Sequence, residues 1–259
     1  MRKIGINMGA IGGLSVEDYI KTLSELGFSA TFSMPFENEK AKKISALCAK
    51  HGIGFETIHA PFRGINRIWS KDPEGDAMLA ELIDAVESCI VMEAPILVVH
   101  LSSGENAPSI TDVGRDRFAR LVDYACTKNV KIAFENQRKL ANLAWSLETF
   151  GPDVAGFCWD CGHEGCFTPG REYMPLFSDR LICTHIHDNR GIYNGDDHML
   201  PFDGALDFDR IAAQLRHSPF DGTLMLEVLV NHSNLYDNVD PIAYLERAAQ
   251  AAKKLAEMI

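Results

Sequence analysis

The chain has 259 residues, of which 46% are hydrophobic and 24% are charged, a composition typical of a folded globular protein with a full core. Its formal net charge is −11, which argues against a nucleic-acid partner, because such proteins usually present a basic surface to the phosphates. The opening "MRKIGINMGA" is too short and too interrupted for a signal peptide, and no run approaches the roughly 18 apolar residues of a membrane span.

Short apolar runs rich in β-branched residues alternate with segments of helical periodicity along the whole chain. The first helical segment opens with Ser15-x-x-Asp18, a capping-box pattern, and ends at Gly27, a plausible C-terminal cap. The last one, "PIAYLERAAQAAKKLAEMI", closes the chain. Eight strands are predicted, at residues 3–8, 30–34, 54–60, 96–101, 131–136, 156–160, 181–187 and 223–229.

Eight strands alternating with helices over about 250 residues predict a (β/α)8 barrel or an open, doubly wound sheet. A dinucleotide-binding open sheet requires G-x-G-x-x-G after the first strand, and "NMGAIGG" has the wrong glycine spacing. We therefore predict an α/β protein, with residues 1–259 forming a single TIM-barrel domain. The longest segments without a predicted element are 61–75 and 188–207, and long loops in compact barrels are often functional. The seven cysteines are scattered through predicted helices and strands, so we expect no disulfide framework and a cytoplasmic location.

Polar residues recur at the ends of the predicted strands, where the catalytic groups of a TIM barrel lie. Each follows an apolar run, in which a charge is costly without a partner. A single such residue is usually a satisfied core histidine or a salt-bridged glutamate, but recurrence at six strand ends favours a shared site. These residues are His59, His100, Glu135, Asp160, His185 and Glu227.

Four consecutive strands deliver an oxygen or nitrogen donor to the same mouth, which suits a divalent cation such as Mn²⁺, Mg²⁺, Co²⁺ or Zn²⁺. The predicted metal ligands are Glu135, Asp160, His185 and Glu227. Cys158-x-x-Cys161 has no second C-x-x-C at a suitable spacing, so these two cysteines are interpreted as buried thiols.

These motifs resemble those of the xylose-isomerase-like TIM-barrel superfamily, which contains sugar-phosphate isomerases and epimerases, ketose 3-epimerases, inosose dehydratases and endonuclease IV. The resemblance covers essentially the whole chain and rests on "IAFEN", "WDCGH" as D-x-x-H, "HIHDN" followed by "DDHMLPFDG", and "LEV". It implies the same four metal ligands, with His163 as a substrate-binding or second-metal residue. The family pattern has an acidic residue three positions after the ligand histidine. Asp188 satisfies this for His185, whereas Arg190 follows His187, so His185 is the predicted ligand, and His187 either supports a ligand from behind or contacts the substrate.

The resemblance implies a sugar or sugar-phosphate isomerase or epimerase that transfers a proton through an enediolate, with Glu135 and Glu227 as the acid/base pair. Its partner is a small-molecule sugar or sugar phosphate, and a homo-oligomer is left open. Trp69 is a candidate apolar face for the sugar, whereas a core role is preferred for Trp159. The loop residues Arg63 and Arg67 either cover the pocket or are solvated. Predicted substrate contacts are His59, His100, His163, His187, Arg190 and His198.

Two alternatives stay open. One is a metal-dependent phosphodiesterase, because endonuclease IV uses three metals and its matching positions here hold suitable residues. Against it, "VVHLSSG" and "AFENQRKLANL" lack the glycine-rich continuations of that branch, and the net charge disfavours a polyanion. The other is a non-catalytic sugar-binding barrel that retains a metal. The positions that match endonuclease IV are His59, His100, Glu135, Asp160, His163, His185, Asp196, His198 and Glu227.

Overall fold

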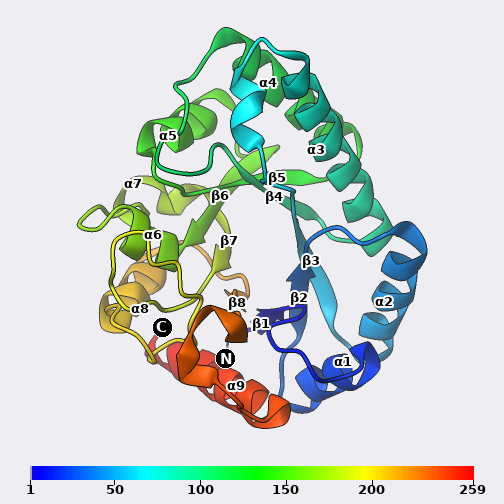
Figure 1. Ribbon diagram of the computed structural model, residues 1–259, viewed down its shortest axis with the longest axis vertical. Helices are drawn as coiled ribbons and strands as arrows, with labels where there is room; N and C mark the ends of the chain where they lie inside the picture. Colours follow the sequence, from blue (N-terminus) through cyan, green and yellow to red (C-terminus); the bar gives the residue numbers. More distant parts are fainter. Residues whose placement is uncertain (1) are drawn as a thin grey trace.

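A ring of eight parallel strands forms the centre of the computed structural model, which describes residues 2–259, and helices surround it (Figure 1). The strands follow one another around the ring in chain order, and β8 lies beside β1. The ring is nearly closed between β7 and β8, where the backbone N–H of Ile186 donates to the Met225 carbonyl at 2.8 Å. The strands are β1 (Ile4–Asn7), β2 (Ala30–Ser33), β3 (Gly54–His59), β4 (Ile96–His100), β5 (Lys131–Glu135), β6 (Ala155–Asp160), β7 (Leu181–His185) and β8 (Leu224–Leu226).

The predicted TIM barrel is therefore confirmed, and every predicted strand is present within three residues at either end. The α-helices are α1 (Val16–Glu25), α2 (Asn38–Lys50), α3 (Pro73–Met92), α4 (Asp112–Thr127), α5 (Leu140–Thr149), α6 (Cys161–Phe167), α7 (Met174–Phe177), α8 (Phe208–His217) and α9 (Pro241–Met258). Short 3-10 helices are η1 (Ile65–Trp69), η2 (Ser178–Arg180), η3 (Val230–His232) and η4 (Asn234–Tyr236). That residues 1–259 form a single domain stays a prediction.

The predicted cap of the first helix is present. The Ser15 hydroxyl accepts from the Asp18 backbone N–H at 3.1 Å, and Gly27 after the helix has a φ of 89°. Tyr19, Ile20 and Leu23 share one side of α1 and are buried against the barrel, as the helical period requires. Packing of such faces against the strands makes the main core, which lies between the ring and the helices.

Inside the ring, a small apolar layer lies beneath the polar mouth. Side chains two residues apart on a strand point the same way, so the residue two positions before each polar strand end also faces the lumen. Four of these residues form a buried cluster of their own, Val98, Ala133, Cys158 and Cys183. The Cys158 thiol is part of this layer and lies below Asp160. It is buried, as the sequence predicts.

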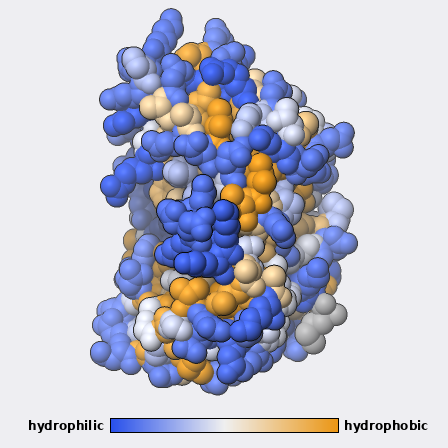
Figure 2. Space-filling model, turned by 90° about the vertical axis from the view of Figure 1, so that its right-hand side faces the viewer, coloured by the Kyte–Doolittle hydropathy of each residue, from blue (hydrophilic) through white to orange (hydrophobic). Residues whose placement is uncertain are grey.

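The outer face formed by α1, α2 and α3 is mainly hydrophilic, with scattered hydrophobic patches (Figure 2). Val16 on α1 and Ile90 on α3 are each 43% exposed. A homo-oligomer stays a prediction. Across the described residues 2–259, none of the helices has the length and apolar character needed to cross a bilayer.

Candidate metal and substrate site

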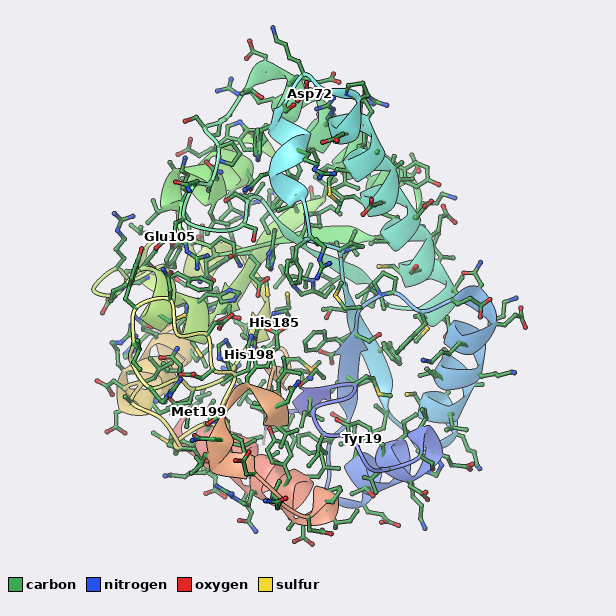
Figure 3. All side chains as sticks on the ribbon, viewed as in Figure 1. Tyr19, Asp72, Glu105, His185, His198 and Met199 are labelled. Carbon is green, nitrogen blue, oxygen red and sulfur yellow. The ribbon has the colours of Figure 1, made fainter. Side chains whose placement is uncertain are left out.

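The polar strand ends meet at one mouth of the barrel. Parallel pairing places His100 beside Glu135 and Asp160 beside His185, so neighbouring donors lie at the same level. Glu227 directly follows β8 and joins them with a side chain that is 16% exposed. Figure 3 shows His185 and His198 together at the centre of the molecule, whereas Asp72 lies at its outer edge.

Glu135 is the hub of this cluster, and its side chain is fully buried. One carboxylate oxygen, Oε2, lies 2.6 Å from Nε2 of His100 and 3.3 Å from Nε2 of His59. The other, Oε1, lies 2.8 Å from Nδ1 of His185. The same His185 nitrogen is 3.2 Å from Oε2 of Glu227, so one imidazole links the two predicted acid/base residues.

Asp160 joins the cluster from the junction of β6 and α6. Its Oδ1 accepts from the backbone N–H of His163 at 2.6 Å and so caps the start of α6. The Asn136 side chain holds the Asp160 backbone from both sides, at 2.8 Å to its N–H and 2.8 Å to its carbonyl. The Nε2 of His187 lies 3.0 Å from Asp160 Oδ1, and no Cβ fits at Gly162 because it would come 1.9 Å from the His187 ring.

A second set of donors comes from the long loop after β7. Asp196 Oδ2 lies 3.4 Å from Nε2 of His163 and 3.3 Å from Nε2 of His198. The rings of His187 and His198 stack with their centroids 4.1 Å apart. His185 and His187 therefore both face the mouth, as their spacing predicts, but they contact different carboxylates.

Asp188 folds this loop back over the barrel. Its buried carboxylate accepts from the backbone N–H groups of Asn189, Gly204 and Leu206 at 2.8–3.0 Å. A short antiparallel bridge to Met199 fixes the middle of the loop. The acidic residue three positions after His185 therefore fixes the backbone that returns Asp196 and His198 to the mouth.

The buried charges shift one another's proton affinities. Burial raises the pKa of Glu135, but the charges of His185 and His100 outweigh burial and hold this pKa well below its ordinary value. Burial also raises the pKa of Glu227, but the charge of His185 lowers it by more, so this pKa too lies below its ordinary value. Burial lowers the pKa of His185, yet the carboxylates of Glu227 and Glu135 raise it well above its ordinary value. At neutral pH both glutamates are therefore ionised.

The pKa values of His163 on α6 and of the loop residues His198 and Asp196 are shifted in the same way. Burial lowers the pKa of His163, but Asp160 and Asp196 raise it to about 10 overall. Burial also lowers the pKa of His198, and Asp196 and Glu227 raise it to about 9. For Asp196, burial raises the pKa, but His163 lowers it strongly, with a net decrease. The four carboxylates at this mouth thus require positive charge close to them, which imidazolium groups or a bound cation can supply.

The donor set fits a divalent cation. One oxygen from each of Glu135, Asp160 and Glu227 and one ring nitrogen of His185 lie within 4.8 Å of one another. Across the described residues, the buried His185 Nε2 and Asp196 Oδ1 have no hydrogen-bond partner, a costly state that a ligand would relieve. Four further groups of donors lie equally close together, and two of them extend the site: His59, His100 and Glu135, and His163, His187, Asp196 and His198.

A cavity of about 250 Å³ opens above these donors. It is lined by six of the donors and by residues that the sequence did not suggest, among them Phe62 and Gln137. Gln137 Nε2 lies 3.3 Å from His100 Nε2 and 3.0 Å from His163 Nδ1, and Phe62 stacks on the His100 ring. The sequence indicates a place for Gln137 near the site only through its position, two residues after Glu135 and just beyond the end of β5.

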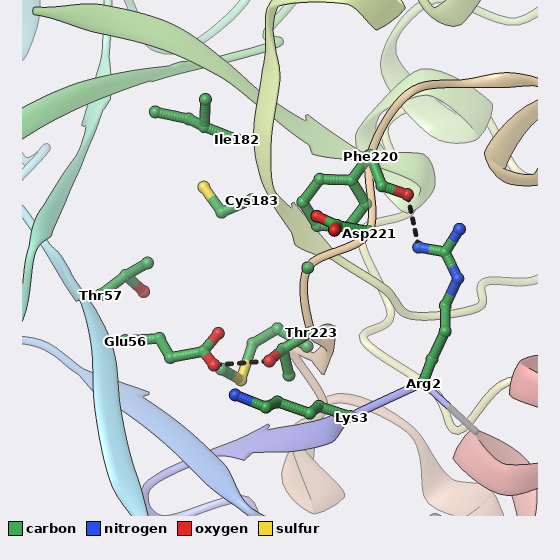
Figure 4. Close-up of a pocket in the computed structure, with 11 residues that line it drawn as sticks. Arg2, Lys3, Glu56, Thr57, Ile182, Cys183, Phe220, Asp221 and Thr223 are labelled. Atoms are coloured by element: carbon green, nitrogen blue, oxygen red, sulfur yellow. Dashed lines mark hydrogen bonds between the residues drawn. The ribbon is translucent and has the colours of Figure 1, made fainter. Parts of the chain in front are cut away.

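A larger cavity of about 660 Å³ lies at the opposite end of the barrel, where the strands begin (Figure 4). It is lined by residues near the start of strands or just before them, such as Lys3 and Glu56. Glu56 accepts from the Thr223 hydroxyl at 2.5 Å, and Arg2 donates to the Phe220 carbonyl at 2.6 Å. TIM-barrel active sites occupy the carboxyl ends of the strands, so the smaller cavity is the candidate site.

Two of the predicted substrate contacts do not line this cavity, His187 and Arg190. The guanidinium of Arg190 pairs with Asp197 at 2.6 Å, and its side chain is 56% exposed. Trp69 is buried at 3% exposure, donates to the Leu101 carbonyl at 2.7 Å and packs on Phe118, so it is a core residue and not a sugar platform.

Trp159 and Arg67 do not line the cavity either. Trp159 is a core residue, as preferred, and donates to Glu164 at 3.0 Å. Arg67 pairs with Glu74 on the surface, with a side chain that is 59% exposed.

The chain has the fold of several solved sugar epimerases. The D-psicose 3-epimerase of Clostridium cellulolyticum H10, crystallised with D-tagatose, is similar with a TM-score of 0.81 at 13% identity over 99% of both chains. The IolI protein with a bound zinc atom has a TM-score of 0.76 at 18% identity, over 99% of this chain and 96% of that one. At these identities the likeness establishes the fold.

Two curated relatives match parts of the chain. The uncharacterized protein y4fM of Sinorhizobium fredii is 36% identical over 58% of this chain and 46% of its own length. The uncharacterized protein MJ1311 of Methanocaldococcus jannaschii is 22% identical over 66% of this chain and 63% of its own. The chain thus spans about half to two thirds of these relatives. The model of the xylose isomerase-like TIM barrel family matches residues 20–258, and the chain belongs to this family.

Proposed function

We propose that this protein is a divalent-metal-dependent isomerase or epimerase of a sugar or sugar phosphate. The observation that carries the proposal is the pair of ionised carboxylates, Glu135 and Glu227, on either side of the His185 ring nitrogen at the base of a cavity. Structural similarity to D-psicose 3-epimerase and to a D-tagatose 3-epimerase-like protein supports the assignment.

The reaction removes a proton from a carbon next to a carbonyl group, which leaves an enediolate, and returns the proton to the neighbouring carbon or to the opposite face. Glu227 follows β8 and lines the cavity, whereas Glu135 ends β5 and lies beneath the wall residues His59 and His100, so the two carboxylates approach the site from different strands. One accepts the proton from carbon and the other delivers a proton. A divalent cation held by Glu135, Asp160, His185 and Glu227 would stabilise the negative charge that develops on the substrate oxygens.

The neighbouring side chains position the substrate in this scheme. His163 and His198 line the cavity and carry ring N–H groups that can donate to sugar hydroxyls. Phe62 and Phe167 line the same cavity and provide apolar surfaces for the C–H groups of a sugar. His187 is buried behind Asp160, so we assign it to holding that carboxylate.

The direct test is exchange of substrate C–H protons in deuterated water. Protein loaded with Mn²⁺, Co²⁺, Mg²⁺ or Zn²⁺ is incubated with a panel of ketoses and ketose phosphates, and deuterium at carbon is followed by NMR or mass spectrometry. Deuterium incorporation with formation of an isomer or epimer supports the proposal. Tight sugar binding without any exchange would instead support the non-catalytic barrel.

A metal-dependent phosphodiester hydrolase is the second candidate, and one observation favours it. Three of the donor groups are contiguous: the group of Glu135, Asp160, His185 and Glu227 shares Glu135 with that of His59 and His100, and its Asp160 lies 3.5 Å from His163 of the group with Asp196. Such an arrangement could hold more than one cation, as phosphodiester hydrolysis often requires. Cleavage of a duplex with an abasic site, followed on a gel, tests this candidate, and the net charge of −11 disfavours it.

A further inference from the structure

A second, basic cavity adjoins the proposed active site. It has a volume of about 410 Å³ and shares two wall residues, Arg138 and Phe167, with the cavity above the donors. The Arg138 guanidinium carbon lies 3.6 Å from the centre of the Phe167 ring, so these two side chains form one stacked partition. The two cavities therefore meet at this partition.

The second cavity contains cations without acidic partners. It is lined by Arg138, Lys139 and Arg171, and within residues 2–259 none of these three has a carboxylate within 4.0 Å. By contrast, Arg190 and Arg210 both pair with acidic side chains. An accumulation of unpaired positive charge is unexpected in a chain with a net charge of −11.

Asn194 lies between Arg138 and Glu105, the one acidic residue among those that line this cavity. The Asn194 carbonyl oxygen accepts from Nη2 and Nε of Arg138 at 2.9 and 3.2 Å, while its amide nitrogen donates to Glu105 at 2.5 Å. A neutral amide thus orients the guanidinium without neutralising it. Asn194 adopts a φ of 60°, a left-handed conformation that asparagine tolerates better than most residues. The Arg138 Nη1 group makes no hydrogen bond to the described residues and is available to a ligand.

We propose that this second cavity binds an anionic group at the far end of the substrate, either a phosphate monoester or a carboxylate. Arg138 and Arg171 are the specificity-determining residues, because guanidinium groups bind such oxyanions through paired N–H donors. Tyr193 lies at the rim with 58% exposure and offers a hydroxyl to the same group. The inference rests on the proposed sugar isomerase or epimerase function and narrows its substrates to sugar phosphates or sugar acids.

The test compares D-arabinitol 5-phosphate, D-arabinitol and D-arabinonate as unreactive probes of the metal-loaded protein, by calorimetry. The expected result is binding of the phosphate, or of the carboxylate, at least 10-fold tighter than binding of the neutral polyol. The two charged probes distinguish the two sources of negative charge. Equal affinity for all three probes would overturn the inference.

Two variants and a matched control locate the effect. Arg171→Gln, at an exposed position, should weaken binding of the charged probe roughly 5- to 20-fold, and Arg138→Gln should weaken it further, with little change for D-arabinitol. Arg115→Gln removes the same charge from the exposed surface of α4 and should change nothing. Charged-probe binding that survives both cavity substitutions would contradict the assignment.

The outcome is separable from that of the proposed function. If no ketose or ketose phosphate exchanges its C–H protons, the isomerase or epimerase proposal fails, while the polyol probes still decide whether the basic cavity binds an anion. If exchange occurs equally with phosphorylated and free ketoses and Arg171→Gln affects both equally, the inference fails and the proposed function stands.

Discussion

The Nδ1 atom of His185 lies 2.8 Å from Oε1 of Glu135 and 3.2 Å from Oε2 of Glu227, so one imidazole nitrogen lies between two buried carboxylates. Its other ring nitrogen has no hydrogen-bond partner within residues 2–259. Two carboxylates this close require a cation between or beside them. His185 supplies it when protonated, and a divalent metal would supply it when the ring is neutral.

Metal binding should stabilise the fold. At a metal concentration of about 100 times Kd, binding contributes about 2.7 kcal/mol, which corresponds to a Tm increase of roughly 5–10 °C for a chain of this size. The increase in Tm is measured by thermal unfolding, first with EDTA and then with each of Mn²⁺, Mg²⁺, Co²⁺ and Zn²⁺. His185→Asn should abolish most of the increase, whereas His217→Asn, at an exposed position on α8, should retain it. An unchanged Tm with all four metals would contradict a metal site.

The pH dependence of stability follows from the histidines when EDTA is present. The pKa of His163 is raised to about 10 and that of His198 to about 9. The protonated rings therefore stabilise the fold fully below their unfolded pKa of about 6.5, and this stabilisation is lost as the pH rises through 9 to 10. Glu135 and Glu227 have lowered pKa values, so their contribution is present above about pH 4.5 and is lost in acid.

We therefore expect the free energy of unfolding with EDTA to fall from about pH 7 to pH 10, as urea titrations at several pH values would show. With saturating metal the alkaline decrease should be smaller, because neutral histidines are then the bound form. A metal-free protein that gains stability from pH 7 to pH 10 would contradict this assignment of charges.

Gly162 should be sensitive to a single added methyl group. Its Cβ would lie 1.9 Å from the buried His187 ring, so Gly162→Ala forces this ring away from Asp160. We expect a loss of about 1–3 kcal/mol in stability, the usual cost of overpacking, together with weaker metal binding by calorimetry. Gly151→Ala is the matched control, because no atom lies within 4 Å of the added Cβ there. Unaltered metal affinity in Gly162→Ala would show that His187 does not hold Asp160.

Glu164 should be the structural anchor of α6. Its buried carboxylate accepts from the Trp159 ring N–H at 3.0 Å, the Tyr173 backbone N–H at 3.0 Å and Arg210 at 2.8 Å. Glu164→Ala leaves these donors without an acceptor and should lower the free energy of unfolding by about 2–4 kcal/mol in urea titrations. Glu172→Ala removes an exposed carboxylate 3.6 Å from the same Arg210 and should cost less than about 0.5 kcal/mol. Similar costs for the two variants would contradict this role.

Much of the barrel was predictable because its signals are local. Strand periodicity and the alternation with helices identified all eight strands, and the strand ends identified the donors from His59 to Glu227. The roles of these donors stay predictions. Their convergence follows from topology, since the carboxyl ends of parallel strands share one mouth.

The remaining features depend on loop paths, which local patterns do not determine. Arg190 lies five residues after the end of β7 and turns outward to Asp197. Arg138 lies three residues after the end of β5 and turns inward over Phe167. Trp69 had an attractive position in a loop, but η1 carries it into the core against Phe118. Which side of a loop faces a cavity is decided by contacts with distant segments, such as Asn194 with Arg138.

The central claim is that Glu135 and Glu227 transfer the proton at the substrate carbon. The decisive measurement is the rate of C–H deuterium exchange by metal-loaded Glu135→Gln and Glu227→Gln, with the substrate that the wild-type protein turns over. Each variant should lose activity at least about 100-fold, because an amide cannot accept the proton, while much of the metal binding is retained. Glu56→Gln, at the opposite end of the barrel, should exchange at the wild-type rate. Wild-type exchange rates in both Glu135→Gln and Glu227→Gln would contradict the account.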